Sequence, residues 1–442
     1  MEQSFDSFGR VDRRERRSLS LERLETDFTR TLPKDASLLP FGNGRSYGDS
    51  CHNDAGFLVP MQARRRIVHF DPDRGVLTAE SGVLLGEIIA HVAPHGYFLP
   101  VTPGTQFVTL GGAIANDVHG KNHHRQGTFG CHVDALDLLR SDGVQYRCSA
   151  AENPDLFRAT IGGMGLTGLI LRATIRLMRV GGLDVEEKIW AFANLDAYFD
   201  MAEIADSENE YAVAWVDQLS NGRGLLMVGN HVAAPGDAHI AASVRLGVPF
   251  DLPFPVLNKA SLSLFNAAYF HRKRRMTAAH GVPYRNFFYP LDAIRNWNRL
   301  YGPAGLYQHQ SVIPLDAART IIPAMLAASR VARQVSFLTV LKRFGSVKSP
   351  GLMSFPMPGY TLTMDFPNRG RKTLELLDRL DRMTVEAAGR VNPYKDQRMS
   401  ARTFAASYPR WRDFEPFRDK AFNSNFWRRT ALRLSEAGEA MR

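Results

Sequence analysis

The sequence predicts a two-domain protein that combines helices and strands in an α+β or α/β arrangement. Residues 36–180 consist of short apolar runs separated by glycine-rich turns, which is typical of short strands with a few helices between them. Between about residues 183 and 388 the pattern shifts to longer strands and helices. A chain of 442 residues, 44% of them apolar and with scattered glycine and proline, is long enough for two unequal domains. This composition excludes a fibrous or disordered chain.

The first 180 residues are expected to begin with a helix and to continue mainly as strands. Residues 19–32 read LSLERLETDFTRTL, whose apolar residues lie three and four apart, and predict one amphipathic surface helix. LLGEIIAHV and ENPDLFRATI also read as helices. Short apolar runs follow one another at SLLPF, GFLVP, RIVHF, GVLTAE, VDALDLL and LILRATIRLM.

The second block contains longer strands and helices, including YAVAWVDQ, GLLMVGNH, LDAARTIIPAMLAASR, VSFLTVLKRFG and YTLTMDFP. From about residue 390 the chain is charged and aromatic, and it ends in the helix-like FNSNFWRRTALRLSEAGEAM. We find no internal repeat and no low-complexity segment.

Charge and cysteine content narrow the class of protein. The 55 Lys and Arg residues outnumber 45 Asp and Glu by 10, which favours anionic partners. The basic residues are spread along the chain without interleaved aromatic residues, so no nucleic acid partner is expected. Cys51, Cys131 and Cys148 form no CxxC pair and are expected to be free thiols. With no membrane-length apolar run and no signal peptide, the protein is expected to be cytoplasmic or peripheral on the inner membrane.

One unusual patch covers residues 244–285. The proline-broken apolar run PFDLPFPVL precedes FNAAYFHRKRRM, which contains four consecutive basic residues, 272–275. Such a pair can lie in a membrane interface, with the apolar part in the acyl boundary and the cations on phosphates. The alternative is a solvated loop beside an apolar stretch that faces the core.

Three glycine-rich segments can bring backbone N–H groups close to a pyrophosphate. They are FGNGRSYGD at 41–49, PGT at 103–105 leading into TLGGA at 109–113, and GGMGLTG at 162–168. The third contains a literal G-x-G-x-x-G, but it follows a helix and opens a strand. A nicotinamide Rossmann fingerprint needs the reverse order, so that domain is not expected. Each loop alone is equally compatible with a plain structural turn.

The string NDVHGKNHH at 116–124 is rich in histidine. His119 and His123 lie four apart, and on a helix both imidazoles would share one face, as in a zinc site. Gly120 inside the string, and the absence of a Glu beside His119, argue against a metalloprotease, and no metal is expected. The alternatives are a polar loop packed against a cofactor and a surface turn.

These segments resemble the FAD-binding domain of the vanillyl-alcohol oxidase superfamily. GNGRSYGD, VTPGTQFVTLGGAIANDVHGKNHHRQGTFGCHV and ENPDLFRATIGGMGLTGLI carry the resemblance. Within the superfamily the sequence is similar to the decaprenylphosphoryl-β-D-ribose 2'-oxidase family. That similarity continues through NWNRLYGPAGLYQHQSVIP, LMSFPMPGYTLTMDFP and YKDQRMSARTFAASYPR.

The resemblance implies an α+β fold with a discontinuous FAD-binding domain, residues 1–180 and 390–442, and a substrate-binding cap domain, residues 181–389. It implies a non-covalent FAD, because the places where sister branches attach the flavin carry Arg45 and Phe107. The implied catalytic residues are His119, Lys395 and Tyr47. The implied cofactor-binding residues are Gly42, Asn43, Gly44, Arg45, Ser46, Tyr47, Gly104, Thr105, Thr109, Gly112, Asn116, Gly120, Asn122, Gly163, Gly165 and Gly168. The implied substrate-binding residues are Gln308, Gln310, Lys342, Thr363 and Asp365.

The implied reaction is oxidation of the 2'-hydroxyl of a polyprenylphosphoryl-β-D-ribose to a ketone, the first half of an epimerisation to the arabinose donor. A short-chain reductase would complete the epimerisation, and the enzyme would contact a membrane surface. Such chemistry needs a base for the hydroxyl proton and a cation near the reduced flavin, tasks that His119 and Lys395 can divide. Relatives of the family have Asn and Cys where this chain has Thr361 and Thr363. The alternative is an FAD-dependent oxidase or dehydrogenase of a free alditol or aldonolactone.

Overall fold

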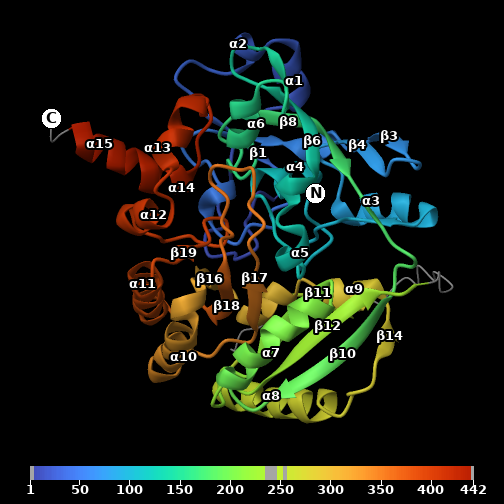
Figure 1. The fold of residues 1–442 in the computed structure, drawn as a ribbon. Coiled ribbons are helices and arrows are strands. Elements are labelled where there is room, and N and C mark those ends of the chain that lie inside the picture. Colours follow the sequence, from blue (N-terminus) through green and yellow to red (C-terminus); the bar gives the residue numbers. More distant parts are fainter. Residues whose placement is uncertain (1–3, 234–245, 252–255, 440–442) are drawn as a thin grey trace.

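The computed structural model describes residues 4–233, 246–251 and 256–439, and its ribbon has two parts that are each built on a β-sheet (Figure 1). The smaller sheet has five antiparallel strands in the order β3-β4-β8-β6-β7. Its strands are β3 (Ile67–Asp71), β4 (Val76–Glu80), β6 (Val133–Leu139), β7 (Gln145–Ser149) and β8 (Leu169–Arg176). The strand pairs β1 (Leu38–Phe41) with β2 (Phe57–Pro60), and β5 (Tyr97–Phe98) with β9 (Met178–Arg179), lie outside this sheet.

The larger sheet has eight strands in the order β14-β10-β12-β11-β17-β18-β16-β19. Their bounds are β10 (Val185–Phe192), β11 (Tyr211–Val216), β12 (Gly224–His231), β14 (His280–Val282), β16 (Leu306–Ile313), β17 (Thr339–Phe344), β18 (Gly359–Pro367) and β19 (Arg390–Val391). β19 pairs with β16, so this sheet reaches two residues past the expected end of the cap domain at residue 389. A short parallel pair, β13 (Leu246–Gly247) and β15 (Ile294–Arg295), forms a separate two-stranded sheet.

Helices cover one face of the larger sheet. Apolar side chains of β11, β12, β16, β17 and β18 form a buried cluster with α7, α10 and α11. The α-helices are α1 (Leu21–Thr26), α2 (Phe28–Thr31), α3 (Leu85–Val92), α4 (Leu110–Ala115), α5 (His123–Gln126), α6 (Pro154–Thr160), α7 (Leu195–Glu208), α8 (Lys259–Lys273), α9 (Tyr284–Phe288), α10 (Leu315–Val331), α11 (Arg371–Glu386), α12 (Ala401–Ser407), α13 (Trp411–Phe414), α14 (Asn425–Trp427) and α15 (Arg433–Glu439). On the opposite face α8 packs against β10, β11 and β12, and the candidate site lies at β16, β17 and β18.

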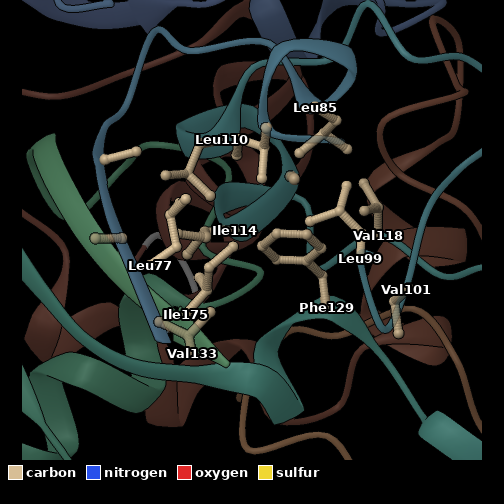
Figure 2. Close-up of a cluster of buried hydrophobic side chains, with 14 of the residues drawn as sticks. Leu77, Leu85, Leu99, Val101, Leu110, Ile114, Val118, Phe129, Val133 and Ile175 are labelled. Carbon is tan, nitrogen blue, oxygen red and sulfur yellow. The ribbon is translucent and has the colours of Figure 1, made fainter. Parts of the chain in front are cut away.

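The core of the first part surrounds α4. Figure 2 shows Leu110 and Ile114 of this helix among side chains from the five-stranded sheet, including Leu77 and Ile175, with Phe129 beside them. All of these side chains are buried. Because α4 contains the end of the second glycine-rich segment, residues 110–113, this packing fixes where that segment lies.

The chain returns to the first part at its C-terminus. Leu38 of β1 forms a parallel bridge with Phe422, and the aromatic residues Phe404, Phe414 and Trp427 pack in one cluster with Leu39. The red C-terminal helices α12–α15 accordingly lie beside the blue and teal elements of the first part (Figure 1). The α+β class predicted from the sequence is confirmed.

The prediction of one continuous helix over residues 19–32 is wrong. Residues 19–32 form two short helices, α1 and α2, because Asp27 between them is extended and its side chain accepts a hydrogen bond from the Arg30 N–H. Their apolar residues, among them Leu21, Leu24 and Phe28, are buried against β1 and β2. None of the helices in the described ranges combines the length and the hydrophobicity that crossing a bilayer requires.

Candidate active site

Three neighbouring strands of the larger sheet present polar side chains on the face opposite α7, α10 and α11. β16 and β18 pair so that Gln308 lies opposite Asp365 and Gln310 opposite Thr363, while Thr361 lies opposite Lys342 of β17. Residues between them, such as Leu362 and Met364, pack into the helix-covered core. This alternation follows from the two-residue period of a strand. It brings the five predicted substrate-binding residues onto one surface.

His119 lies against this surface. His119 precedes α5, and its backbone forms an isolated β-bridge with Thr128, which follows this helix. Its ring packs edge-on against Phe344 with 4.7 Å between centroids. Its Nε2 lies 3.0 Å from Gln310 Nε2, and its Nδ1 lies 3.3 Å from Lys342 Nζ. Burial, and to a smaller extent the nearby Lys342, hold the pKa of His119 well below its usual range. The ring is therefore neutral at physiological pH.

Two of the predicted catalytic residues, Lys395 and Tyr47, lie in contact. The Lys395 ammonium sits 4.1 Å from the centre of the Tyr47 ring, a cation–π contact. Burial raises the pKa of Tyr47 well above its usual value, so this side chain stays a phenol. Burial lowers the pKa of Lys395 to about 8, against the opposing pull of Asp365.

Asp365 is the carboxylate of the site. It is fully buried, its Oδ1 accepts a hydrogen bond of 2.5 Å from Gln308, and its Oδ2 has no partner among the described residues. Burial raises its pKa to about 7, while the Gln308 bond and Lys395 work in the other direction. An unpartnered buried oxygen is a natural acceptor for a hydroxyl of a bound sugar.

A network of buried ion pairs holds the turn that carries Lys395. Arg398 forms a two-pronged pair with Asp381 of α11, at 2.5 and 2.7 Å. Arg429, near the C-terminus, pairs with Asp49 at 2.8 and 2.9 Å and with Asp396, the neighbour of Lys395, at 2.5 Å. The network thus joins α11, the Lys395 turn, the C-terminal helices and the first glycine-rich segment.

The glycine-rich segments line a common cavity. Ten predicted cofactor-binding residues line it: Gly42, Asn43, Gly44, Arg45, Ser46, Thr109, Gly112, Asn116, Gly165 and Gly168. A side chain at Gly42 would collide with Thr109 Oγ1 at 2.6 Å, and Gly44 and Gly165 have φ of +59° and +75°. Glycine is therefore required at these turns.

The cavity also offers unused polar groups. Arg45 Nε, Ser50 Oγ and Ser81 Oγ are buried, line the cavity and have no hydrogen-bond partner among the described residues. Buried polar groups normally have partners, so these three fit a polar ligand such as the diphosphate of FAD. The residues present therefore fit the cofactor that the sequence predicts.

Six predicted cofactor-binding residues do not line this cavity. Tyr47 lies beside Lys395, and Asn122 is used within the protein, donating to Pro100 O and Glu210 Oε1 at 2.8 and 2.9 Å. Thr105 Oγ1 accepts from the Phe107 N–H. The others are Gly104, Gly120 and Gly163. Asn43 lines the cavity, yet its amide is held by Phe107 O and Gln62, so it positions the loop.

Sequence reasoning missed several residues of the site. Ser50 and Ser81 line the cavity, and Asn392, which is fully buried, bonds Gln310. Ser50 lies one residue past the GNGRSYGD segment, which is the signal that would have found it. Lys121, inside the histidine string, donates to the Phe287 carbonyl, and burial lowers its pKa to about 8.

The zinc alternative depended on one helix carrying both His119 and His123. α5 begins at His123 and leaves His119 outside, and the ring of His123 packs on Phe344 at 4.5 Å. Within the part of the chain that the structure describes, no three His, Cys, Asp or Glu side chains gather as metal ligands would.

We expect acid precipitation of the holoprotein to release all of its flavin into the supernatant. Cys51 is the one thiol that lines the cavity, and burial raises its pKa to about 12, which disfavours the nucleophilic thiolate. Both ring nitrogens of His119 already face protein groups. The absorbance of supernatant and pellet near the flavin band is the measurement. Yellow colour in the pellet, lost in Cys51→Ser, would identify a covalent link.

Sequence comparisons with known proteins show which family the chain belongs to. The family model of the FAD binding domain matches residues 32–149. Decaprenylphosphoryl-beta-D-ribose oxidase from Mycolicibacterium smegmatis is 35% identical over 427 residues, which cover 88% of each chain. L-gulonolactone oxidase from Mus musculus is 31% identical over 135 residues, 30% of each chain. Delta(24)-sterol reductase from Homo sapiens is 31% identical over 112 residues, 25% of this chain and 22% of the reductase.

The three relatives match different lengths of this chain, and the difference decides the family. The mouse and human proteins match less than a third of this chain, whereas the M. smegmatis oxidase matches along nearly all of it, so that its similarity includes the larger sheet with Gln310, Lys342 and Asp365. The chain is an FAD-dependent oxidoreductase, and it belongs to the decaprenylphosphoryl-beta-D-ribose oxidase family.

Proposed function

We propose that the protein oxidises the 2'-hydroxyl of a polyprenylphosphoryl-β-D-ribose to the 2'-keto sugar. The observation that carries this proposal is the polar face of β16, β17 and β18 within a 35% identity that covers 88% of both chains. The face offers a sugar two kinds of group, amide and carboxylate side chains for its hydroxyls and an amine beside His119. Gln308 and Asp365 are of the first kind, and Lys342 is of the second.

The chain's own residues would orient the sugar and manage its charges. When bound, FAD supplies the two-electron oxidant and accepts the hydride that leaves the sugar carbon. The unpartnered oxygen of Asp365 accepts a hydrogen bond from a sugar hydroxyl, and the Lys395 ammonium balances negative charge that develops beside Tyr47. The keto sugar would then pass to a separate short-chain reductase, which completes the epimerisation.

A surface suited to a lipid-linked substrate lies next to the site. Leu246, Phe250, Leu264 and Phe265 are 71, 61, 75 and 46% exposed, and all belong to the unusual patch at 244–285. Residues 244–245 and 252–255 of that patch lie outside the described residues.

The same patch connects inward to the site. Leu257 and Leu262, at the start of α8, pack in one buried cluster with Tyr47 and Tyr301. The apolar patch and the Tyr47 ring beneath Lys395 are therefore neighbours in one apolar cluster. This proximity favours a substrate with a polyprenyl tail over a free alditol.

Substrate comparison tests this function. Purified holoprotein should reduce its flavin with a prenylphosphoryl ribose under anaerobic conditions, and should do so far more slowly with free ribose, alditols or aldonolactones. Faster reduction by a free alditol or aldonolactone would replace the proposal with the sister activity, for which L-gulonolactone oxidase is the similar protein.

Removal of exposed basic residues should weaken membrane contact. Arg272, Arg274 and Arg275 are exposed and make no ion pair with any described residue, whereas Lys273 lies 3.5 Å from the buried carboxylate of Glu187 and is best retained. Because each cation near an anionic surface contributes about 1 kcal/mol, replacing the three Arg with Ser should weaken binding to anionic liposomes by about 3 kcal/mol at low salt. Liposome co-sedimentation measures this.

The matched control removes three exposed cations from another surface. Arg369, Lys372 and Arg379, around α11, should be replaced by Ser with little change in liposome binding. Turnover of a short-tailed, detergent-soluble substrate should be the same in both variants. Equal losses of liposome binding in both would mean that the contact is diffuse and that the patch at 244–285 has no special role.

A further inference from the structure

The side chains around His119 form a chain of hydrogen bonds whose direction can be traced from one fixed point. The backbone N–H of Tyr394 can only donate, and it donates to Asn392 Oδ1 at 3.1 Å. This bond fixes which end of the Asn392 amide is oxygen. The other end, Nδ2, must then donate, and its acceptor is Gln310 Oε1 at 2.8 Å.

The orientation of Gln310 follows from that of Asn392. With Oε1 facing Asn392, the Gln310 NH₂ group faces His119 Nε2 at 3.0 Å and Thr361 Oγ1 at 3.1 Å. Both of its hydrogens are therefore used. The reverse orientation would set two NH₂ groups against each other and is excluded.

His119 Nε2 must consequently be the acceptor in its bond with Gln310. A neutral imidazole carries one proton, so this proton lies on Nδ1. The nitrogen that faces Nδ1 is Lys342 Nζ, 3.3 Å away. An ammonium there would set a donor against a donor, whereas an uncharged amine has a lone pair that accepts the Nδ1 proton.

We propose that the chain of hydrogen bonds from the Tyr394 N–H through Asn392 and Gln310 fixes neutral His119 with its proton on Nδ1, and thereby holds Lys342 as an uncharged amine that accepts the proton of the substrate hydroxyl. Asn392 is then a positioning residue that acts through Gln310 and His119. Neither ring nitrogen of His119 is free to act as the base. This reassigns the task that the sequence alone gave to His119.

The charges around Lys342 agree with an uncharged amine. Burial, with contributions from Lys121 and Lys395, lowers the pKa of Lys342 to about 7. His123 also faces this group, and burial lowers the pKa of His123 to about 3, so it adds no positive charge. Asp365, the carboxylate of this face, acts on Lys395, and Glu187 acts on Lys121. The Gly120 backbone acts in the opposite direction and raises the pKa of His119, but burial outweighs it.

The proton balance of the step is simple. The hydroxyl O–H bond breaks and its proton forms a new N–H bond on Lys342, which becomes an ammonium. The C–H bond of the same carbon also breaks, its hydrogen leaves with both bonding electrons as hydride to the oxidant that bound FAD would supply, and the carbon–oxygen bond becomes a carbonyl. This step rests on the proposed function, but the position of the His119 proton can be measured without any substrate.

Asn392→Asp is the sharpest test, because it keeps the shape and reverses the chain of hydrogen bonds. A carboxylate still accepts from the Tyr394 N–H, but its second oxygen also accepts, so Gln310 must turn and present Oε1 to His119. The proton of His119 then moves to Nε2, and Nδ1 becomes an acceptor for a Lys342 ammonium. ¹⁵N-histidine NMR of the holoprotein reports the protonated nitrogen directly, with the His119 signals assigned by their loss in His119→Gln.

We expect Nδ1–H in the wild type and Nε2–H in Asn392→Asp. Asn392→Ala, which has neither donor nor acceptor, should give a mixture of both forms. Flavin reduction should rise with pH through about 7 in the wild type, and this limb should move at least one unit higher in Asn392→Asp, costing about tenfold in rate at pH 7. Thr361→Val, which removes the other acceptor of Gln310, should keep Nδ1–H.

Two results would overturn the proposal: a proton on Nε2 in the wild type, or a folded Asn392→Asp variant that keeps Nδ1–H. The wild-type spectrum decides the matter even if the variant fails to fold. A wild type with Nδ1–H that does not oxidise prenylphosphoryl ribose would leave the hydrogen-bond assignment standing and remove only the substrate.

Discussion

Replacing Lys395 by Met is expected to slow the reduction of bound FAD by substrate by about 10²- to 10³-fold, the usual cost of removing one preorganised electrostatic group from an active site. The side chain keeps its length and loses the charge that lies over the Tyr47 ring. Asp365, the neighbouring carboxylate, would then have no cation to balance it. Stopped-flow absorbance under anaerobic conditions measures the rate, and FAD content and thermal unfolding show that the protein is intact.

The pH dependence provides a second measurement of the same residue. Burial lowers the pKa of Lys395 to about 8, so its positive charge is present below that pH and is lost as the pH rises through it. Wild-type reduction should therefore fall above about pH 8, and this limb should be absent in Lys395→Met. Lys420→Met, an exposed lysine of the same C-terminal segment, is the control and should be indistinguishable from the wild type. Reduction of Lys395→Met at the wild-type rate would remove Lys395 from the site.

Arg398→Met is expected to lower the free energy of unfolding by about 3–5 kcal/mol, since removing one partner of a buried ion pair leaves the other charge uncompensated. Asp381, which would be left, is 1% exposed and receives both prongs of the Arg398 guanidinium. Arg382→Met is the matched control. It also removes the arginine of an Arg–Asp pair on α11, but Arg382 and Asp378 are exposed on the surface. Exposed pairs four residues apart contribute about 0.3–0.5 kcal/mol.

The pH dependence of unfolding should reveal the contribution of the same Arg398–Asp381 pair. Burial alone would raise the pKa of Asp381, but Arg398 and His309 lower it to about 2. A carboxyl with a depressed pKa contributes stability above its unfolded pKa of about 4, and this contribution is lost as the pH falls from about 4 toward 2. Denaturant unfolding across this range should show a steeper loss in the wild type than in Arg398→Met. Parallel curves would mean that the pair contributes nothing to stability.

The sequence predicted the parts of the site that follow local patterns. The resemblance to the family implied Gln308, Gln310, Thr363 and Asp365, and in the structure they lie at every second position of two strands, which places each pair on one face of its strand. The glycine-rich segments likewise predicted a cavity, because positive φ and close approach at Gly44 and Gly165 are local requirements. The α+β class and most strands followed from the same patterns.

What the sequence could not predict depends on pairing across long separations. Arg429 meets Asp49 across 380 positions, and Asn392 meets Gln310 across 82. No local period relates such residues. The break at Asp27 is a different case, since aspartate is a common helix N-cap and could have been recognised as one. The expected single helix gave more weight to apolar spacing than to that signal.

The bridge between Leu38 and Phe422 has a consequence for how the protein is made in the cell. The ribosome completes the first glycine-rich segment and the whole five-stranded sheet long before it adds the C-terminal helices that pack on β1. Contacts of such high sequence separation form late and slowly. The nascent flavin domain must therefore wait, with its apolar β1 flank uncovered, while the intervening domain is synthesised. A stop codon upstream of Phe422 would therefore remove part of the core of the first domain, just as a deletion within residues 1–180 would.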